Sequence, residues 1–141
     1  MRSVEVMSKA IAWMAGLFLV GHGLIGLMIE GNHFLLFSTD FALDVLWLAS
    51  GGALFFASRA TAGEFFVRLV LGGVGAVFIL LGVLGLFDRY LFGAAPIGLG
   101  EGDHLIFFGG GAATLLGAIL PHAGRPIWET PTAAPDGTVN R

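Results

Sequence analysis

The stretch FFVRLVLGGVGAVFILLGVLGLF, residues 65–87, decides the fold class. Its single charged side chain, Arg68, lies close to its start. About 20 mostly apolar residues are enough for an α-helix to cross the hydrocarbon core of a bilayer. Because backbone polar groups in lipid must pair within their own segment, we expect a membrane-spanning helix here. The alternating polarity that would indicate a membrane β-barrel strand is absent.

Three further apolar segments, 10–29, 41–58 and 103–120, have similar length and composition. The first follows a basic N-terminus but is too long, and lacks the small-residue cleavage site, to be a signal peptide. We therefore predict an all-α, integral membrane four-helix bundle over 10–120, preceded by a cytoplasmic N-terminus, 1–9. Residues 121–141 hold four of the five prolines and show no periodicity, which predicts a mobile cytoplasmic tail.

The overall composition agrees with a membrane protein and excludes other classes. Of 141 residues, 56% are hydrophobic and 12% are charged, whereas soluble domains have about 25% charged residues. The net charge of −3 with only 7 basic residues argues against a nucleic-acid partner. The absence of cysteine excludes disulfides and thiolate metal sites.

The distribution of Lys and Arg predicts the orientation, because these residues are enriched in cytoplasmic loops. Only Arg89 belongs to the two connections on one side of the predicted bundle. The other side carries the remaining basic residues, Arg2, Lys9, Arg59, Arg68, Arg125 and Arg141. Both termini are therefore expected in the cytoplasm. The apolar connection between the third and fourth helices, 88–102, is expected to lie on the membrane surface or to cover the mouth of the bundle.

The two halves of the chain match at a constant offset of 59 residues, which predicts an internal duplication into two parallel helical hairpins. The match is strongest where Asp44 falls on Asp103 and the run 51–53 falls on 110–112, both Gly-Gly-Ala. In the first and third helices, Gly16, Gly23 and Gly26 fall on Gly75, Gly82 and Gly85.

Small residues at regular spacing predict close helix packing, because backbone approach at small residues drives helix association in lipid. We expect a tight bundle, and the same small-residue faces also suit a homodimer or another membrane protein partner. The predicted packing positions are Gly16, Gly23, Gly26, Gly51, Gly109, Ala113 and Gly117.

The repeated residues resemble an uncharacterised four-pass bacterial membrane family with an Asn-x-x-His element at the start of the second and fourth helices, followed by a Gly. Here the elements read Asp44-Val45-Leu46-Trp47, then Gly51, and Asp103-His104-Leu105-Ile106, then Gly110. Both Asn and both His positions are substituted, so any histidine chemistry of that family is not expected here. The resemblance implies a multi-pass protein of the bacterial plasma membrane. A weaker likeness to DoxX-like membrane proteins implies a link to quinone-coupled oxidation.

Ionisable residues inside membrane spans are costly and are candidates for function. His22, Asp44 and Trp47 would line a cofactor site in the half of the bundle away from the termini. His22 has three interpretations: a structural hydrogen bond, a proton relay with Asp44, or an axial ligand for a haem or chlorophyll-type ring. Asp103 is expected to be the N-cap of the fourth helix.

The sequence carries no catalytic motif and no close pair of metal ligands, so neither a catalytic residue nor a metal site is assigned. Three functions stay open. The first is a non-enzymatic accessory or scaffold subunit in the lipid bilayer. The second is a lipid-, quinone- or pigment-binding protein that uses the bundle interior. The third is a DoxX-like oxidoreductase component.

Overall fold

The computed structural model describes residues 2–29, 33–34, 36–59 and 63–119. Nearly all of this length is helical, with a two-residue antiparallel strand pair in the first long connection. The elements are α1 (Arg2–Met28), β1 (His33–Phe34), β2 (Phe37–Ser38), α2 (Phe41–Arg59), α3 (Glu64–Phe87), a 3₁₀ turn η1 (Leu91–Gly93), α4 (Glu101–Leu105), a π-helical turn η2 (Ile106–Gly110) and α5 (Gly111–Ile119).

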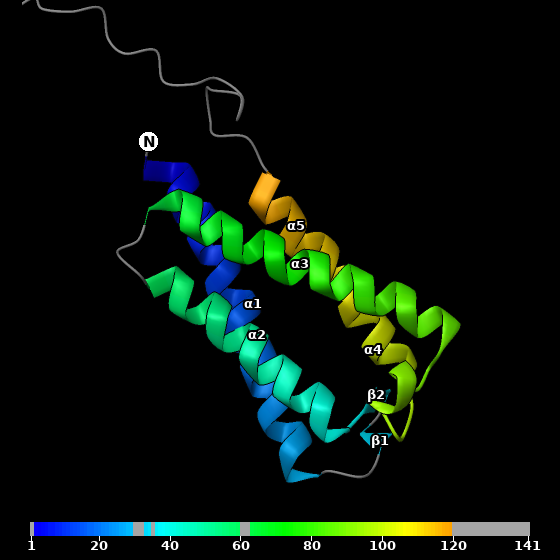
Figure 1. Cartoon of the computed structure of the whole chain (residues 1–141). Helices are drawn as coiled ribbons and strands as arrows, with labels where there is room; N and C mark the ends of the chain where they lie inside the picture. The colour runs from blue at the N-terminus through cyan, green and yellow to red at the C-terminus, as the bar shows by residue number, and fades with distance from the viewer. Residues whose placement is uncertain (1, 30–32, 35, 60–62, 120–141) are drawn as a thin grey trace, which may run out of the picture.

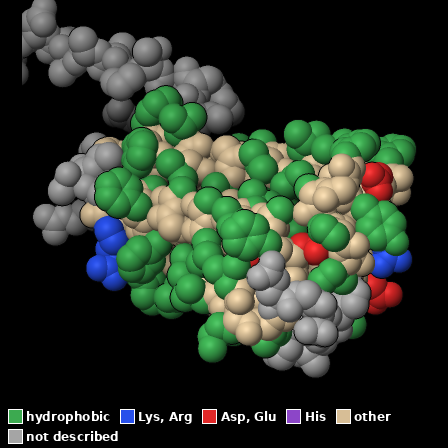
Figure 2. All heavy atoms as spheres, turned by 60° about the horizontal axis from the view of Figure 1, so that its bottom comes forward, with side chains coloured by type: hydrophobic (Ala, Val, Ile, Leu, Met, Phe, Trp, Pro, Cys, Tyr) green, Lys and Arg blue, Asp and Glu red, His purple; other side chains and the backbone are tan. Residues whose placement is uncertain are grey.

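Four helical segments are long and apolar enough to cross a membrane, which makes the chain a multi-pass membrane protein. They run over Met7–Met28, Phe41–Arg59, Glu64–Phe87 and Glu101–Ile119, close to the predicted bounds. Hydrophobic side chains cover most of the face shown in Figure 2, where Lys and Arg lie only toward the two ends. Residues 2–9 continue α1 instead of forming a separate segment, and the predicted tail, 121–141, lies outside the described residues.

The helices form two antiparallel hairpins (Figure 1). In the first, α1 packs along α2, and in the second, α3 packs along α4, η2 and α5. The hairpins meet through α2 against α3 and α1 against α5. We call the end that holds the connections 29–40 and 88–100 the loop end. The opposite end, where α1 and α3 begin, is the termini end.

Glycines set the close approach of the helices within each hairpin. A Cβ on Gly16 would lie 2.8 Å from the carbonyl oxygen of Gly51, and one on Gly51 would lie 2.8 Å from that of Gly16. The second hairpin repeats this contact, since a Cβ on Gly75 would lie 2.8 Å from the carbonyl oxygen of Gly111. Such backbone contact leaves no room for a side chain and is typical of helix pairs in membranes.

These paired contacts are offset by 59 residues in α1 and α3 but by 60 residues in the returning helices. The extra residue lies in η2, whose π-helical turn holds more residues than an α-helical turn. Gly111 is therefore the counterpart of Gly51 in space, whereas the sequence alignment pairs Gly51 with Gly110.

Two of the predicted packing positions take no part in packing within the described chain. Gly109 and Ala113 are exposed on the outside of the bundle, because the π-helical turn changes which residues face inward. The buried small or polar residues of α5 are instead Gly111, Thr114 and Gly117. Gly117 does pack as predicted, since a Cβ there would lie 3.1 Å from Cγ2 of Ile11.

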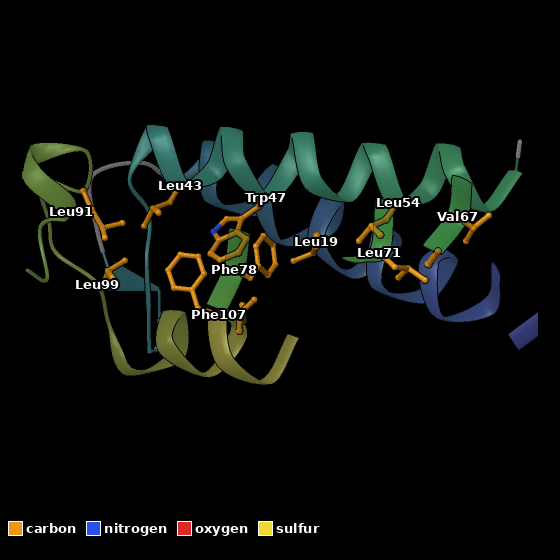
Figure 3. Packing of buried hydrophobic residues seen from close by; sticks show 13 residues of the cluster. Leu19, Leu43, Trp47, Leu54, Val67, Leu71, Phe78, Leu91, Leu99 and Phe107 are labelled. Atoms are coloured by element: carbon orange, nitrogen blue, oxygen red, sulfur yellow. The ribbon is translucent and has the colours of Figure 1, made fainter. Parts of the chain in front are cut away.

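The hydrophobic core runs as one column along the bundle (Figure 3). Trp47, Phe78 and Phe107 fill its middle and are almost fully buried. At the loop end, the connection 88–100 contributes Leu91, Ala95 and Leu99 to the core, so this connection covers the bundle.

Candidate functional site

The loop end of the bundle buries an unusual number of polar side chains. Each is less than 5% exposed, in a part of the molecule built from membrane-spanning helices. Buried polar groups are expensive unless they are hydrogen-bonded, so their partners show what they do. The set comprises Ser38, Thr39, Asp40, Asp44 and Asp103.

Asp103 joins the two hairpins. Its Oδ2 accepts hydrogen bonds from the Ser38 backbone N–H at 3.0 Å, the Ser38 hydroxyl at 2.7 Å and the Gly100 backbone N–H at 2.7 Å. The first two donors belong to β2, on the connection of the other hairpin. The predicted role as N-cap is wrong in detail: α4 begins at Glu101 with Gly100 as N-cap, and Asp103 is the third helical residue, which binds back to the cap.

Further contacts tie the two connections together beside Asp103. The Gly102 N–H donates to the carbonyl oxygen of Leu36 at 2.9 Å, and the Ile97 N–H donates to Oδ1 of Asp40 at 3.1 Å. A Cβ on Gly102 would lie 2.9 Å from the oxygen of Leu36 and 2.5 Å from the ring of Phe37. Only glycine therefore allows the connection 36–40 to lie this close to α4.

Asp44 lies one turn inside α2, as the sequence predicts. Its backbone N–H donates to the carbonyl oxygen of Asp40 at 3.0 Å, and its side chain is fully buried. The carboxylate lies against Gly26 of α1, where any Cβ would collide with it. Asp44 thus packs against the neighbouring helix of its own hairpin, and Asp103 reaches across to the other hairpin.

His22 belongs to a group of aromatic rings that we call the aromatic cluster: His22, Phe37, Trp47, Phe78 and Phe107. The imidazole meets Phe37 edge-on at 4.7 Å between centroids and Trp47 edge-on at 5.8 Å. Trp47 continues to Phe78 at 5.2 Å and to Phe107 at 5.0 Å. The cluster therefore connects α1, β2 and α2 of the first hairpin with α3 and η2 of the second.

The structure brings His22 and Trp47 together, with 5.8 Å between the ring centroids. The Asp44 carboxylate lies over Gly26, one helical turn further along α1. Both His22 and Asp44 belong to the first hairpin, and the proton relay between them stays a prediction.

The glycines beside His22 do not both leave room for a macrocycle. A Cβ on Gly23 would lie 2.8 Å from the carbonyl oxygen of Asp44 and 2.9 Å from the side chain of Leu48, so α2 fills this space. Gly21 has nothing within 4 Å of the corresponding position. With Phe37 and Trp47 also packed against the imidazole, this geometry does not favour haem or chlorophyll ligation by His22.

Two buried polar atoms close to the aromatic cluster have no hydrogen-bond partner among the described residues: Nε1 of Trp47 and Oδ1 of Asp103. Figure 3 shows the indole nitrogen directed toward the loop end, where Leu43, Leu91 and Leu99 lie. In a bilayer an unsatisfied polar group costs several kcal/mol, so these two atoms mark where a polar ligand group would be stabilised.

His104 does not join the aromatic cluster. It is half-buried, with its Nδ1 3.0 Å from the carbonyl oxygen of Gly100, within its own helical turn. His33 belongs to β1, and His122 lies outside the described residues. Within the described ranges, no three His, Asp or Glu side chains are arranged to hold a metal ion.

Sequence reasoning missed Phe37, Ser38 and the π-helical turn as parts of this site. Neither Phe37 nor Ser38 lies in a predicted span, and no short-range pattern links Ser38 to Asp103, 65 residues away. Only the alignment of Asp103 with Asp44 indicated that the fourth helix contributes a second buried carboxylate.

No family model, no curated protein and no solved structure matches this chain.

Proposed function

We propose that the protein is a non-catalytic subunit of a membrane protein assembly in the bacterial plasma membrane, with both termini in the cytoplasm. The observation that carries this proposal is that buried polar groups at the loop end form hydrogen bonds between the two hairpins. Asp103 and Asp40 accept hydrogen bonds from the opposite connection, and so they stabilise the contact between the hairpins. Such groups give the bundle a fixed shape, which an assembly subunit needs.

The charges at the two ends support the proposed orientation. Arg59 lies over the ring of Phe55 at 5.0 Å, and Arg68 pairs with Glu64 at 2.9 Å, both at the termini end. At the loop end, Arg89 is the single Lys or Arg among the described residues. By the positive-inside rule the termini end faces the cytoplasm. We further propose that the hairpins arose by duplication, with η2 marking a later one-residue insertion.

The partner surface proposed here is the outer side of the second hairpin. Gly73 and Gly109 are exposed there and meet no other helix of the described chain, and Ala113 is exposed one turn beyond Gly109. Small residues on a lipid-facing surface let a helix of another protein approach closely.

The test is native mass spectrometry of protein extracted gently from its own membrane. We expect a complex with a second protein, and we expect Gly109→Leu or Ala113→Leu to abolish it without unfolding the bundle, because both positions face outward. Val77→Leu, at an exposed position on α3 that already carries a large side chain, is the matched control. Retention of the complex in both variants would contradict the proposal that the partner binds this surface.

A second candidate function is the binding of an amphipathic molecule, such as a quinone or lipid, at the aromatic cluster. The observation that favours it is the buried indole N–H of Trp47, which has no acceptor among the described residues. A quinone carbonyl is such an acceptor, and His22 lies beside the indole, with 5.8 Å between the ring centroids. This reading predicts a bare chain that carries a defined small-molecule mass, lost in Trp47→Phe and in His22→Ala while the bundle stays folded.

A further inference from the structure

A hollow of about 480 Å³ opens at the loop end, between the start of α2 and the connection from α3 to α4. Residues 39–42 form one side of it, and four residues of 93–97 form the other. Small-molecule sites in proteins typically have volumes of roughly 300–1,000 Å³. This hollow is separate from the aromatic cluster, since no residue of the cluster lines it.

The lining of the hollow includes one ionisable residue, Asp40, beside Thr39. The residue is 4% exposed, and its Oδ1 accepts one hydrogen bond from the backbone N–H of Ile97. Its Oδ2 is buried and has no hydrogen-bond partner among the described residues. A buried carboxylate with one hydrogen bond is costly, so a cation or a strong donor in the hollow would stabilise it.

The surroundings favour an organic cation over a metal ion. The walls include Phe41, Ala42, Ala94 and Pro96, which supply apolar surface. Ca²⁺ and Mg²⁺ need several oxygen ligands, and a single carboxylate does not provide them. The guanidinium of Arg89, the basic group of this end in the described ranges, lies over the ring of Tyr90 at 5.4 Å.

The rim of the hollow places the ligand near the lipid. Phe41 is 60% exposed, and Phe92, next to the lining residue Gly93, is 79% exposed. Large exposed aromatic side chains at the end of a membrane-spanning helix lie at the level of the lipid headgroups or acyl chains. A ligand there meets the carboxylate with its charged end and the apolar rim with its body.

We propose that this hollow binds the protonated amino group of an amphipathic molecule, with Asp40 as the acceptor of its N–H donors. The source is either a lipid headgroup that carries a primary ammonium, as in phosphatidylethanolamine, or a free long-chain amine. A quaternary ammonium has the same charge but no N–H to donate, so phosphatidylcholine binds more weakly. A hydrogen bond to a charged group corresponds to a preference of about tenfold or more.

The experiment measures lipid retention by native mass spectrometry, together with the thermal unfolding midpoint. The full chain is placed in vesicles of phosphatidylcholine alone, in an equal mixture with phosphatidylethanolamine, and in phosphatidylcholine with n-octylamine. We expect about tenfold preferential retention of phosphatidylethanolamine or of octylamine, with a higher midpoint. Preference for the lipid identifies the headgroup as the source, and preference for octylamine alone identifies a free amine.

Two variants test the site in different ways. Asp40→Asn removes the charge, and Ala94→Leu fills the hollow from an exposed wall position while it leaves the carboxylate in place. Both should abolish the preference. Glu101→Gln, which removes a charge from an exposed position at the same end, is the matched control and should keep it. Equal retention of ethanolamine and choline lipids with no response to octylamine, or an unchanged preference in Ala94→Leu, would overturn the proposal.

Discussion

In the first hairpin, Gly51 follows Asp44 by seven residues of regular α-helix, and both side-chain positions face α1. In the second hairpin, Gly111 follows Asp103 by eight residues, and the π-helical turn η2 lies between them. Yet both glycines make the same backbone contact with the preceding helix, and both aspartates are buried. The π-helical turn therefore absorbs one residue without changing which face packs against the neighbouring helix.

The contacts of the two buried carboxylates also differ. Asp44 lies against Gly26 of its own hairpin, while Asp103 accepts hydrogen bonds from Ser38 of the other hairpin. A carboxylate at equivalent positions of two similar helices is thus buried in both copies, and in the second copy it joins the two hairpins.

Deletion of a single exposed glycine should destabilise the first hairpin much more than the second. Deletion of Gly52 in α2 rotates the residues after it by about 100° and carries the buried Leu54 off the core, with a cost of about 4 kcal/mol in unfolding free energy. Deletion of Gly109 converts the π-helical turn into α-helix and leaves Gly111 facing α3, with a cost of about 1 kcal/mol or less. Denaturant titration in micelles measures both free energies of unfolding. Equal losses in the two deletion variants would show that η2 does not contain an extra residue.

Removal of the Asp103 carboxylate should weaken the contact between the hairpins. In Asp103→Ala, the Ser38 N–H, the Ser38 hydroxyl and the Gly100 N–H lose their acceptor, and buried donors without partners cost about 1–3 kcal/mol each. We expect a loss of about 3 kcal/mol in unfolding free energy. Asp103→Asn keeps one acceptor oxygen and should lose about 1 kcal/mol. If both variants match the wild type in thermal unfolding, Asp103 does not join the hairpins.

The spans could be predicted from the sequence because membrane crossing depends mainly on length and hydropathy, which are properties of single segments. The buried position of Asp44 followed from its place one turn inside a span. The pairing of Asp103 with Ser38 could not be predicted, since it depends on how two connections meet after the helices have packed. The π-helical turn was missed for a related reason. Its extra residue changes which side chains point into the bundle, and this change, which exposes Gly109 and Ala113, is apparent only in the folded structure.

Substitution of the paired glycines by alanine should cost more stability in the hairpin whose helices pack more tightly. A Cβ on Gly51 would meet backbone atoms, at 2.7 Å from the Val20 nitrogen and 2.8 Å from the Gly16 oxygen, so the helices must separate. A Cβ on Gly111 would first meet the flexible side chain of Ile79 at 3.0 Å. We expect Gly51→Ala to cost about 2–3 kcal/mol and Gly111→Ala about 1 kcal/mol, measured by the unfolding midpoint in one detergent. The reverse order would contradict the tighter packing of the first hairpin.

The smallest effect is expected where Trp47 and Phe107 meet, because they are the counterparts that the two hairpins place in the middle of the core. Trp47→Phe makes these positions alike and removes a buried N–H that has no acceptor among the described residues. The smaller ring leaves a cavity, but removal of the unsatisfied donor offsets its cost, so we expect a net change of about 1 kcal/mol or less. A loss well above this value would mean that the indole N–H is satisfied in the membrane, which is the outcome expected if a bound polar headgroup accepts from it.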